Sequence, residues 1–188
     1  RLAGDQSADI AARLDRDGVR VVRGRGRLGP GLTVVVTLPD GAEETLAADA
    51  ILVATGAAPR TLESAQPDGE RILTWEQVYD LDEVPERLVV VGSGVTGAEF
   101  ASAYLALGVP VTLVSSRDRV LPGEDADAAT VIEDVFRKRG MEVLGKSRAA
   151  SVERTADGVV VTLVDGRTVE GSHALLAVGS VPNTAGLG

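Results

Sequence analysis

The chain of 188 residues contains no cysteine, a single histidine (His173) and only 3 % aromatic residues. Without cysteine there is no disulfide framework, no thiol nucleophile and no cysteine-based metal site. One histidine leaves too few groups for a Ser-His-Asp arrangement or a multi-histidine metal site. We therefore expect neither a metal site nor a catalytic side chain within this chain.

Basic charge and long apolar segments are also scarce. Lysine and arginine number 19 against 28 aspartates and glutamates, a net charge of −9. Nucleic-acid-binding domains need basic stripes and stacking rings, so we expect no nucleic-acid partner. No apolar run approaches the roughly 20 residues of a membrane span, and no signal peptide opens the chain. The 44 % of hydrophobic residues suits a core for one large domain or two small ones.

The first third of the chain predicts a helix, short strands and a hairpin. Apolar spacing predicts an amphipathic helix over residues 7–17, followed by a short strand over 19–22. The β-branched run 33–38 and its partner 44–48 flank a Pro-Asp-Gly turn, which predicts a hairpin. The apolar run 51–54 predicts a buried strand.

Strands and helices alternate after a Pro- and Gly-containing linker over residues 58–69. Strands are expected over 88–91 and 111–114, and helices over 95–107 and 124–139. Short connections between alternating strands and helices predict an α/β fold with a parallel sheet.

The last part of the chain repeats the first in order. DVFRKRGMEVL resembles RLDRDGVRVV, VVVTLVDGRTVEG resembles TVVVTLPDGAEETL, and ALLAVGSVP resembles ILVATGAAP. The copies lie roughly 120 residues apart, which is too far for a solenoid and indicates a duplicated domain. The second copy opens with a strand and a glycine turn that the first lacks, so we expect the chain to be a piece of a longer protein.

The segment LVVVGSGVTGAEF, residues 88–100, contains the motif that is most informative about function. Its G-x-G-x-x-G follows an apolar strand and opens a helix, the context that makes this motif specific for dinucleotides. The first glycine permits the tight turn, the second lets the backbone approach a pyrophosphate, and the third lets the helix pack close to the strand. The helix start adds free N–H groups for the phosphates. The candidate contacts are Gly92, Ser93, Gly94, Val95, Thr96 and Gly97.

The end of the next strand indicates which dinucleotide is preferred. An acidic residue there, about 20 residues past the glycines, would hold the ribose of NAD. This chain instead has Ser115, Ser116 and Arg117. Hydroxyls and an arginine suit the 2′-phosphate of NADP, so the sequence favours NADP and leaves NAD as the alternative. A solvated Arg117 whose charge Asp118 partly cancels is the competing interpretation.

Together, VGSGVTGAEF, LPGEDAD, AVGSVPNTAGLG and ILVATGAAP resemble the pyridine nucleotide–disulfide oxidoreductases, flavoproteins such as lipoamide dehydrogenase and glutathione reductase. The likeness covers essentially the whole chain. AQPDGERILTW and VLPGEDADAA look most like an actinobacterial branch described both as lipoamide dehydrogenase-like and as NAD(P)H:quinone reductase.

The resemblance implies a Rossmann-like NAD(P)-binding domain over residues 62–188, a parallel sheet with helices and an antiparallel β-meander. Residues 1–61 would be the rear part of a related FAD-binding domain. The resemblance also assigns roles to single residues. Glu99 matches the family glutamate that contacts the nicotinamide carboxamide, and Val95 stands where some members have a gating tyrosine. Gly179 matches the glycine of the loop that closes near the nicotinamide. Thr55 and Gly56 match the segment near the flavin.

The family's flavin G-x-G-x-x-G, redox cysteines, Gly-Asp motif and dimerisation domain are expected outside this chain. The resemblance implies a cytoplasmic, homodimeric parent enzyme that passes hydride from NADPH or NADH to FAD and on to a small-molecule acceptor, foremost a quinone. We expect this chain alone to be monomeric and inactive. Two alternatives stay open: a dihydrolipoamide dehydrogenase parent, and a nucleotide-sensing module without catalysis.

Overall fold

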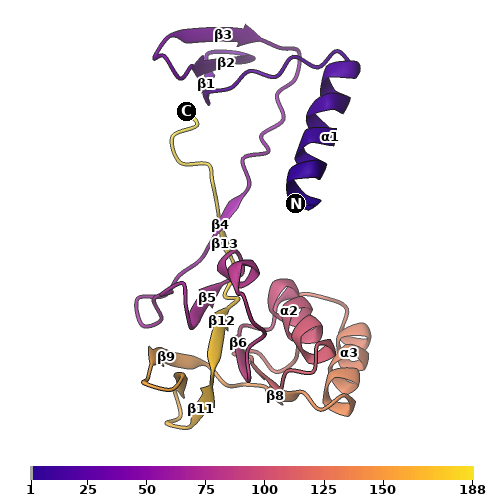
Figure 1. Cartoon of the computed structure of the whole chain (residues 1–188), viewed down its shortest axis with the longest axis vertical. Coiled ribbons are helices and arrows are strands. Elements are labelled where there is room, and N and C mark those ends of the chain that lie inside the picture. The colour runs from indigo at the N-terminus through magenta and orange to yellow at the C-terminus, as the bar shows by residue number, and fades with distance from the viewer. Residues whose placement is uncertain (1) are drawn as a thin grey trace. The chain divides into compact units, whose positions relative to one another are not determined.

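Two units make up the chain in a computed structural model that describes residues 2–188, with side chains from Gly4 onward (Figure 1). Unit 1 contains residues 1–56 and 182–188, and unit 2 contains residues 57–181. The expected domain boundary after residue 61 stays a prediction.

Unit 1 consists of helix α1 (Leu2–Arg16) and a three-stranded antiparallel sheet. Its strands are β1 (Arg25–Gly29), β2 (Thr33–Thr37) and β3 (Glu43–Ala47), in that order. The predicted helix and the predicted hairpin are confirmed. The sequence analysis missed β1, an exposed and glycine-rich strand with little apolar signal.

Two strands predicted for unit 1 are wrong. Residues 19–22 and 51–54 contain no strand, and Leu52 is 90 % exposed. A strand needs a neighbouring strand to take up its backbone N–H and C=O groups. No strand among residues 2–188 pairs with either segment, so apolar content alone was not sufficient.

Unit 2 is built on a five-stranded parallel sheet in the order β5-β12-β6-β7-β8. The strands are β5 (Ile72–Thr74), β6 (Leu88–Val91), β7 (Val111–Val114), β8 (Glu142–Leu144) and β12 (His173–Leu176). Helix α2 (Val95–Ala106) connects β6 to β7, and α3 (Ala126–Lys138) connects β7 to β8. The parallel α/β sheet expected from the sequence is therefore confirmed.

The remaining elements of unit 2 are short or antiparallel. A meander of β9 (Ala149–Arg154), β10 (Val159–Leu163) and β11 (Thr168–Gly171) forms a second sheet. The 3₁₀ helix η1 (Gln77–Asp80) follows β5, and β4 (Ala57–Pro59) pairs with β13 (Ser180–Pro182). The predicted hairpin of the second repeat corresponds to β10 and β11.

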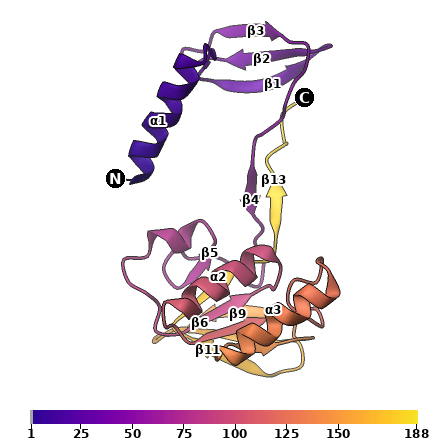
Figure 2. The ribbon, with the colours of Figure 1, turned by 90° about the vertical axis from the view of Figure 1, so that its right-hand side faces the viewer.

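Alternation along the parallel strands divides the core of unit 2 into two layers. Val90 and Leu113 belong to the cluster that contains Ala101 of α2 and Phe136 of α3. Val89 belongs to the cluster formed with the antiparallel meander. Figures 1 and 2 show the helices on one side of β6 and β12 and the meander on the other. Because both faces are covered, β6 and β7 are buried at every position, and Thr112 is the one polar residue in the two strands.

Helix α3 shows how local sequence fixes an element's start. The carboxylate of Asp125 accepts hydrogen bonds from the N–H groups of Asp127 and Ala128, at 3.1 Å each. Arg137 and Lys138 lie in the last turn, where positive charge favours the helix dipole. None of the three α-helices among residues 2–188 has the length and apolarity that a bilayer crossing requires.

Val90→Ala tests the helix-side layer. Val90 is fully buried, so removing two methyl groups should lower the free energy of unfolding of unit 2 by about 2–3 kcal/mol. Val131→Ala removes the same atoms from a side chain that is 62 % exposed and should change stability by less than about 0.5 kcal/mol. Urea unfolding followed by the fluorescence of Trp75, the single tryptophan, reports on this unit. Equal effects of the two substitutions would contradict the layer assignment.

Candidate dinucleotide site

The turn from β6 into α2 holds the three glycines in three different environments. Gly92 has φ +112°, a left-handed conformation that glycine adopts readily, and a Cβ there would collide with the carbonyl oxygen of Ala177. A Cβ on Gly97 would collide with the carbonyl oxygen of Gly92. A Cβ on Gly94 would meet nothing within 4 Å. Two glycines are therefore needed for packing, whereas Gly94 leaves its backbone open to a ligand.

Helix α2 begins directly at this open glycine. Gly94 is the N-cap, and the first hydrogen bond of the helix runs from the N–H of Ala98 to the carbonyl of Gly94 at 2.9 Å. The N–H groups of Val95, Thr96 and Gly97 precede that bond and have no carbonyl within the helix to donate to. With the helix dipole, they make the turn suitable for an anion.

A cavity of about 390 Å³ lies beside the turn. It is formed at the carboxyl ends of β6 and β7, the edge at which open α/β sheets bind their ligands. Its size falls within the range of small-molecule sites. The lining is apolar at the strands and polar at the loops, and none of its members is acidic: Leu62, Ser64, Val91, Gly92, Val114, Ser116, Ser147, Arg148, Ala149 and Val178.

The three residues that follow β7 separate into a buried and an exposed group. Ser115 is fully buried, and its hydroxyl lies 2.7 Å from the hydroxyl of Ser93. It also accepts a hydrogen bond from the N–H of Arg117 at 3.1 Å. Ser116 and Arg117 are exposed, and Ser116 lines the cavity. Ser115 therefore connects the glycine turn to the loop that follows β7, while the next two residues, Ser116 and Arg117, are exposed.

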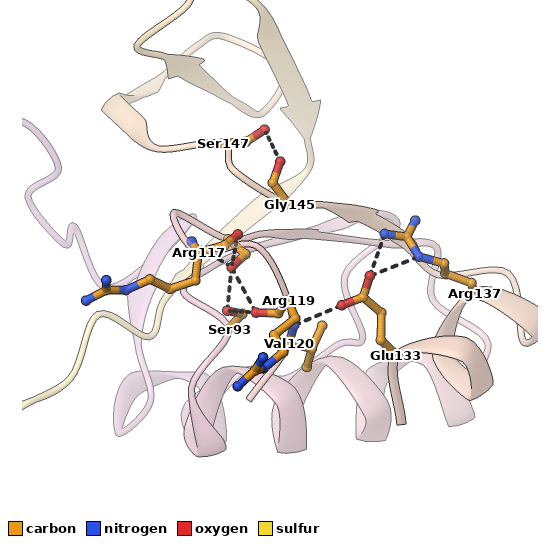
Figure 3. A network of polar contacts seen from close by, with 9 residues as sticks. Ser93, Arg117, Arg119, Val120, Glu133, Arg137, Gly145 and Ser147 are labelled. Carbon is orange, nitrogen blue, oxygen red and sulfur yellow. Dashed lines mark hydrogen bonds and ion pairs between the residues drawn. The ribbon is translucent and has the colours of Figure 1, made fainter. Parts of the chain in front are cut away.

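Figure 3 shows the polar network that holds this loop. The hydroxyl of Ser93 contacts the carbonyl of Arg119, and the carbonyl of Ser93 accepts from the N–H of Leu121 at 2.8 Å. Glu133 of α3 accepts from the N–H of Val120 at 2.9 Å. The side chain of Arg117 extends away from these contacts.

Glu99 and Val95 occupy a different surface. Both are exposed, and both line a mainly apolar hollow of about 860 Å³ between α2 and α3. Gly179 follows β12 at φ +98°, and its carbonyl accepts the N–H of Arg60 at 2.9 Å. The structure thus brings the glycine turn and residues 115–117 together and places Glu99 on the outward face of α2.

Thr55 and Gly56 lie in unit 1. Their carbonyl groups accept hydrogen bonds from the side chain and the backbone N–H of Asn183, at 3.2 and 2.9 Å. The flavin role that the resemblance implies for them stays a prediction.

Ser147 and Arg148 are cavity residues that the sequence analysis missed. They follow β8, the strand next to β7, and so reach the same edge of the sheet. The signal that could have found them is their place just after residues 142–144, where a further parallel strand would follow the predicted helix 124–139.

His173 has no part in this cavity. It begins β12 opposite Leu88, at the amino edge of the sheet, whereas the cavity lies at the carboxyl edge. Partial burial lowers the pKa of the imidazole, and the positive charge of Arg71 lowers it further. Its Nδ1 lies 3.0 Å from the hydroxyl of Ser172. The lowered pKa favours the neutral form of the imidazole.

Alanine at Gly97 tests the packing described for the turn. Because its Cβ would collide with a backbone carbonyl, α2 would have to shift, and stability should fall by about 2 kcal/mol or more. Gly94→Ser is the matched control, since its Cβ meets open space and serine is a favourable N-cap. Urea unfolding of both variants gives the comparison. A stable Gly97→Ala variant would show that the contact with Gly92 is not required.

Comparisons with known proteins agree on the family. The model of the family described as pyridine nucleotide-disulphide oxidoreductase matches residues 2–188. A Mycobacterium tuberculosis protein named NAD(P)H dehydrogenase (quinone) is 62 % identical over all of this chain, which covers 39 % of that protein. A Chlorobaculum tepidum protein named dihydrolipoyl dehydrogenase is 37 % identical over all of this chain and 41 % of its own length.

The structural comparison gives the same result. The crystal structure of LpdA from Mycobacterium tuberculosis superposes with a TM-score of 0.88 at 62 % identity, covering all of this chain and 42 % of that one. The chain spans about two fifths of the length of the relatives it matches. It belongs to the pyridine nucleotide-disulphide oxidoreductase family.

Proposed function

We propose that this chain is the NAD(P)H-binding portion of an FAD-dependent oxidoreductase. The observation that carries the proposal is the cavity at the carboxyl ends of β6 and β7, together with the glycine turn beside it. Among the three glycines of that turn, only Gly94 has open space where a Cβ would lie. That combination fits a dinucleotide, because the cavity accepts an adenosine and the open turn accepts the neighbouring pyrophosphate. Residues 62–188 would form this domain, and residues 1–61 would belong to the FAD-binding domain.

The pyrophosphate would be held by backbone groups. The free N–H groups at the start of α2 offer hydrogen bonds and partial positive charge, and no acidic residue lines the adjoining cavity. Ser93 is buried with its hydroxyl turned to Ser115, so its side chain would shape the turn and leave only backbone groups to contact the pyrophosphate.

Preference for NADP is proposed from the exposed residues that follow β7. Ser116 and Arg117 offer a hydroxyl and a guanidinium, and neither would pair with a bare ribose as a carboxylate does. Ser115, at the position expected for the ribose-binding acid, is buried and bonded to Ser93. Its proposed role is to position this loop, not to contact the cofactor.

When bound, the nicotinamide supplies the hydride and the flavin of the parent enzyme receives it. The residues of this chain orient the dinucleotide. Glu99 is exposed on the second turn of α2 and free to contact the carboxamide, and Val95 leaves the same face without a large gating side chain. Gly179, exposed and in a conformation that favours glycine, would allow the loop after β12 to approach the nicotinamide closely.

A quinone is the proposed electron acceptor. The 62 % identical relative bears the name of a quinone-reducing enzyme, whereas the relative named dihydrolipoyl dehydrogenase is 37 % identical. Dihydrolipoamide is the alternative substrate, and its oxidation would require a redox cysteine pair in the part of the parent enzyme outside this chain. A nucleotide sensor without catalysis is the second alternative.

Gly94→Val tests the placement of the pyrophosphate. A side chain at this open position should fill the space of the phosphates and weaken binding of both NADPH and NADH at least about 100-fold, with little loss of stability. Gly123→Val is the matched control, because its Cβ also meets open space but Gly123 does not line the cavity. Calorimetric titration of the 188-residue chain measures both. Unchanged binding by Gly94→Val would place the phosphates elsewhere.

The acceptor is tested on the longer flavoprotein that the proposal requires. We expect NADPH-dependent reduction of a benzoquinone or naphthoquinone, faster than oxidation of dihydrolipoamide under the same conditions. Steady-state assays with each acceptor decide between the two. Dihydrolipoamide oxidation without quinone reduction would reverse the assignment, and absence of bound flavin would favour the sensor.

A further inference from the structure

A basic rim lies along one side of the cavity. It is formed by residues 115–119, after β7, and residues 145–149, after β8. These ten positions carry a single carboxylate, Asp118, and four cationic side chains: Arg117, Arg119, Lys146 and Arg148. In a chain with a net charge of −9, such a local excess of positive charge marks a surface suited to an anion.

Backbone hydrogen bonds hold the two segments of the basic rim side by side. The N–H of Ser115 donates to the carbonyl of Leu144 at 2.9 Å, and the N–H of Ser147 donates to the carbonyl of Ser115 at 2.7 Å. The N–H of Lys146 donates to the carbonyl of Arg117, also at 2.7 Å. The positions from which Arg117 and Arg148 project are therefore fixed relative to each other.

Ser147 fixes the turn just before Arg148. It is 2 % exposed, and its hydroxyl donates to the carbonyl of Gly145 at 3.1 Å and accepts from the guanidinium of Arg167 at 2.9 Å. Arg167 is itself paired with Asp165 at 2.7 Å. On the other side, the carbonyl of Arg148 accepts the N–H of Val164 at 2.9 Å. The backbone around Arg148 is thus anchored to the meander and to β7.

Within this anchored turn, the side chain of Arg148 lacks a partner. It is exposed and lines the cavity together with Ser116, and among residues 2–188 no carboxylate or carbonyl receives its guanidinium. The guanidinium of Arg117 is likewise exposed and unpaired within the described part of the chain. The cavity wall therefore carries one cation, Arg148, and one hydroxyl, Ser116, that are free to bind a ligand, and Arg117 adds a second unpaired cation next to Ser116 in the chain.

We propose that Arg148 is a specificity-determining residue that binds the ribose 2′-phosphate of NADPH together with Ser116 and Arg117. The inference rests on the proposed function, because it takes the adenosine to occupy this cavity. In that arrangement the ribose lies at the carboxyl end of β7, where the basic rim begins. A phosphomonoester carries nearly two negative charges at pH 7 and accepts charge-assisted hydrogen bonds from arginine. NADH lacks this phosphate, so Arg148 would raise the affinity for NADPH and not the affinity for NADH.

The test is a calorimetric titration of the 188-residue chain with NADPH and with NADH. Arg148→Ala should weaken NADPH about tenfold or more, as expected for a lost charge-assisted hydrogen bond, and change NADH by less than about twofold. Arg148→Lys keeps the charge without the planar fork and should recover part of the NADPH affinity. Lys138→Ala is the charge-matched control, because the last turn of α3 lies at the opposite edge of the sheet.

Two simpler probes locate the contact on the ligand. Adenosine 2′-monophosphate should compete with NADPH and lose affinity in Arg148→Ala, whereas adenosine 5′-monophosphate should bind both proteins equally. Thermal unfolding of each variant confirms that the fold is retained. Any loss of stability in Arg148→Ala leaves Arg148→Lys as the deciding variant.

The outcomes separate this inference from the proposed function. Equal weakening of NADPH and NADH by Arg148→Ala, or an unchanged affinity for NADPH, overturns the role of Arg148 while the dinucleotide site stands. A chain that prefers NADH also overturns it. The proposed function itself is overturned if the unmodified chain binds neither NADPH nor NADH and the Gly94→Val variant gives the same titration result.

Discussion

The approach of Gly97 to the carbonyl of Gly92 is the contact on which the candidate site depends. It lets α2 begin directly against the end of β6, so the first turn of α2 starts close to Gly92, which lines the cavity. A larger residue at either glycine would push the helix away and separate its first turn from the cavity wall. The close backbone contacts of the turn are made at Gly92 and Gly97, and Gly94 remains exposed.

The second requirement is a parallel sheet that is covered on both faces. The helices pack on one face and the antiparallel meander on the other, so the strands themselves are almost wholly apolar. Polar residues can then gather only beyond the strand ends. The carboxyl edge of β6, β7 and β8 carries a glycine turn, a serine–arginine loop and a second serine–arginine turn. The fold thus gathers polar and charged residues at one edge of the sheet, while no charged side chain in the described part of the chain is buried in its core.

Sequence patterns predicted those parts of the structure that local chemistry determines. The strand–glycine–helix segment and the alternation in 88–139 were predictable because these strands and helices follow one another directly along the chain. The run 51–54 has the same apolar character, but no strand in the described chain pairs with it. Spacing alone is equally insufficient: Gly24, Gly26 and Gly29 also read G-x-G-x-x-G, yet they lie on or beside β1 with no helix after them. Context, not the motif, distinguishes a phosphate turn from a glycine-rich edge.

The burial of Ser115 is a feature of the candidate site that the sequence did not predict. The sequence places three polar residues after β7, and a linear reading treats all three as ligands. In the structure the first is hydrogen-bonded to Ser93, the second lines the cavity, and the third is exposed beside it. The position that an acid would occupy in an NAD site is thereby used for packing, and in the proposed site the charge toward the ribose would come from elsewhere. Arg148 would supply that charge from a loop distant in sequence, because parallel strands end at a common edge and β8 is the neighbour of β7.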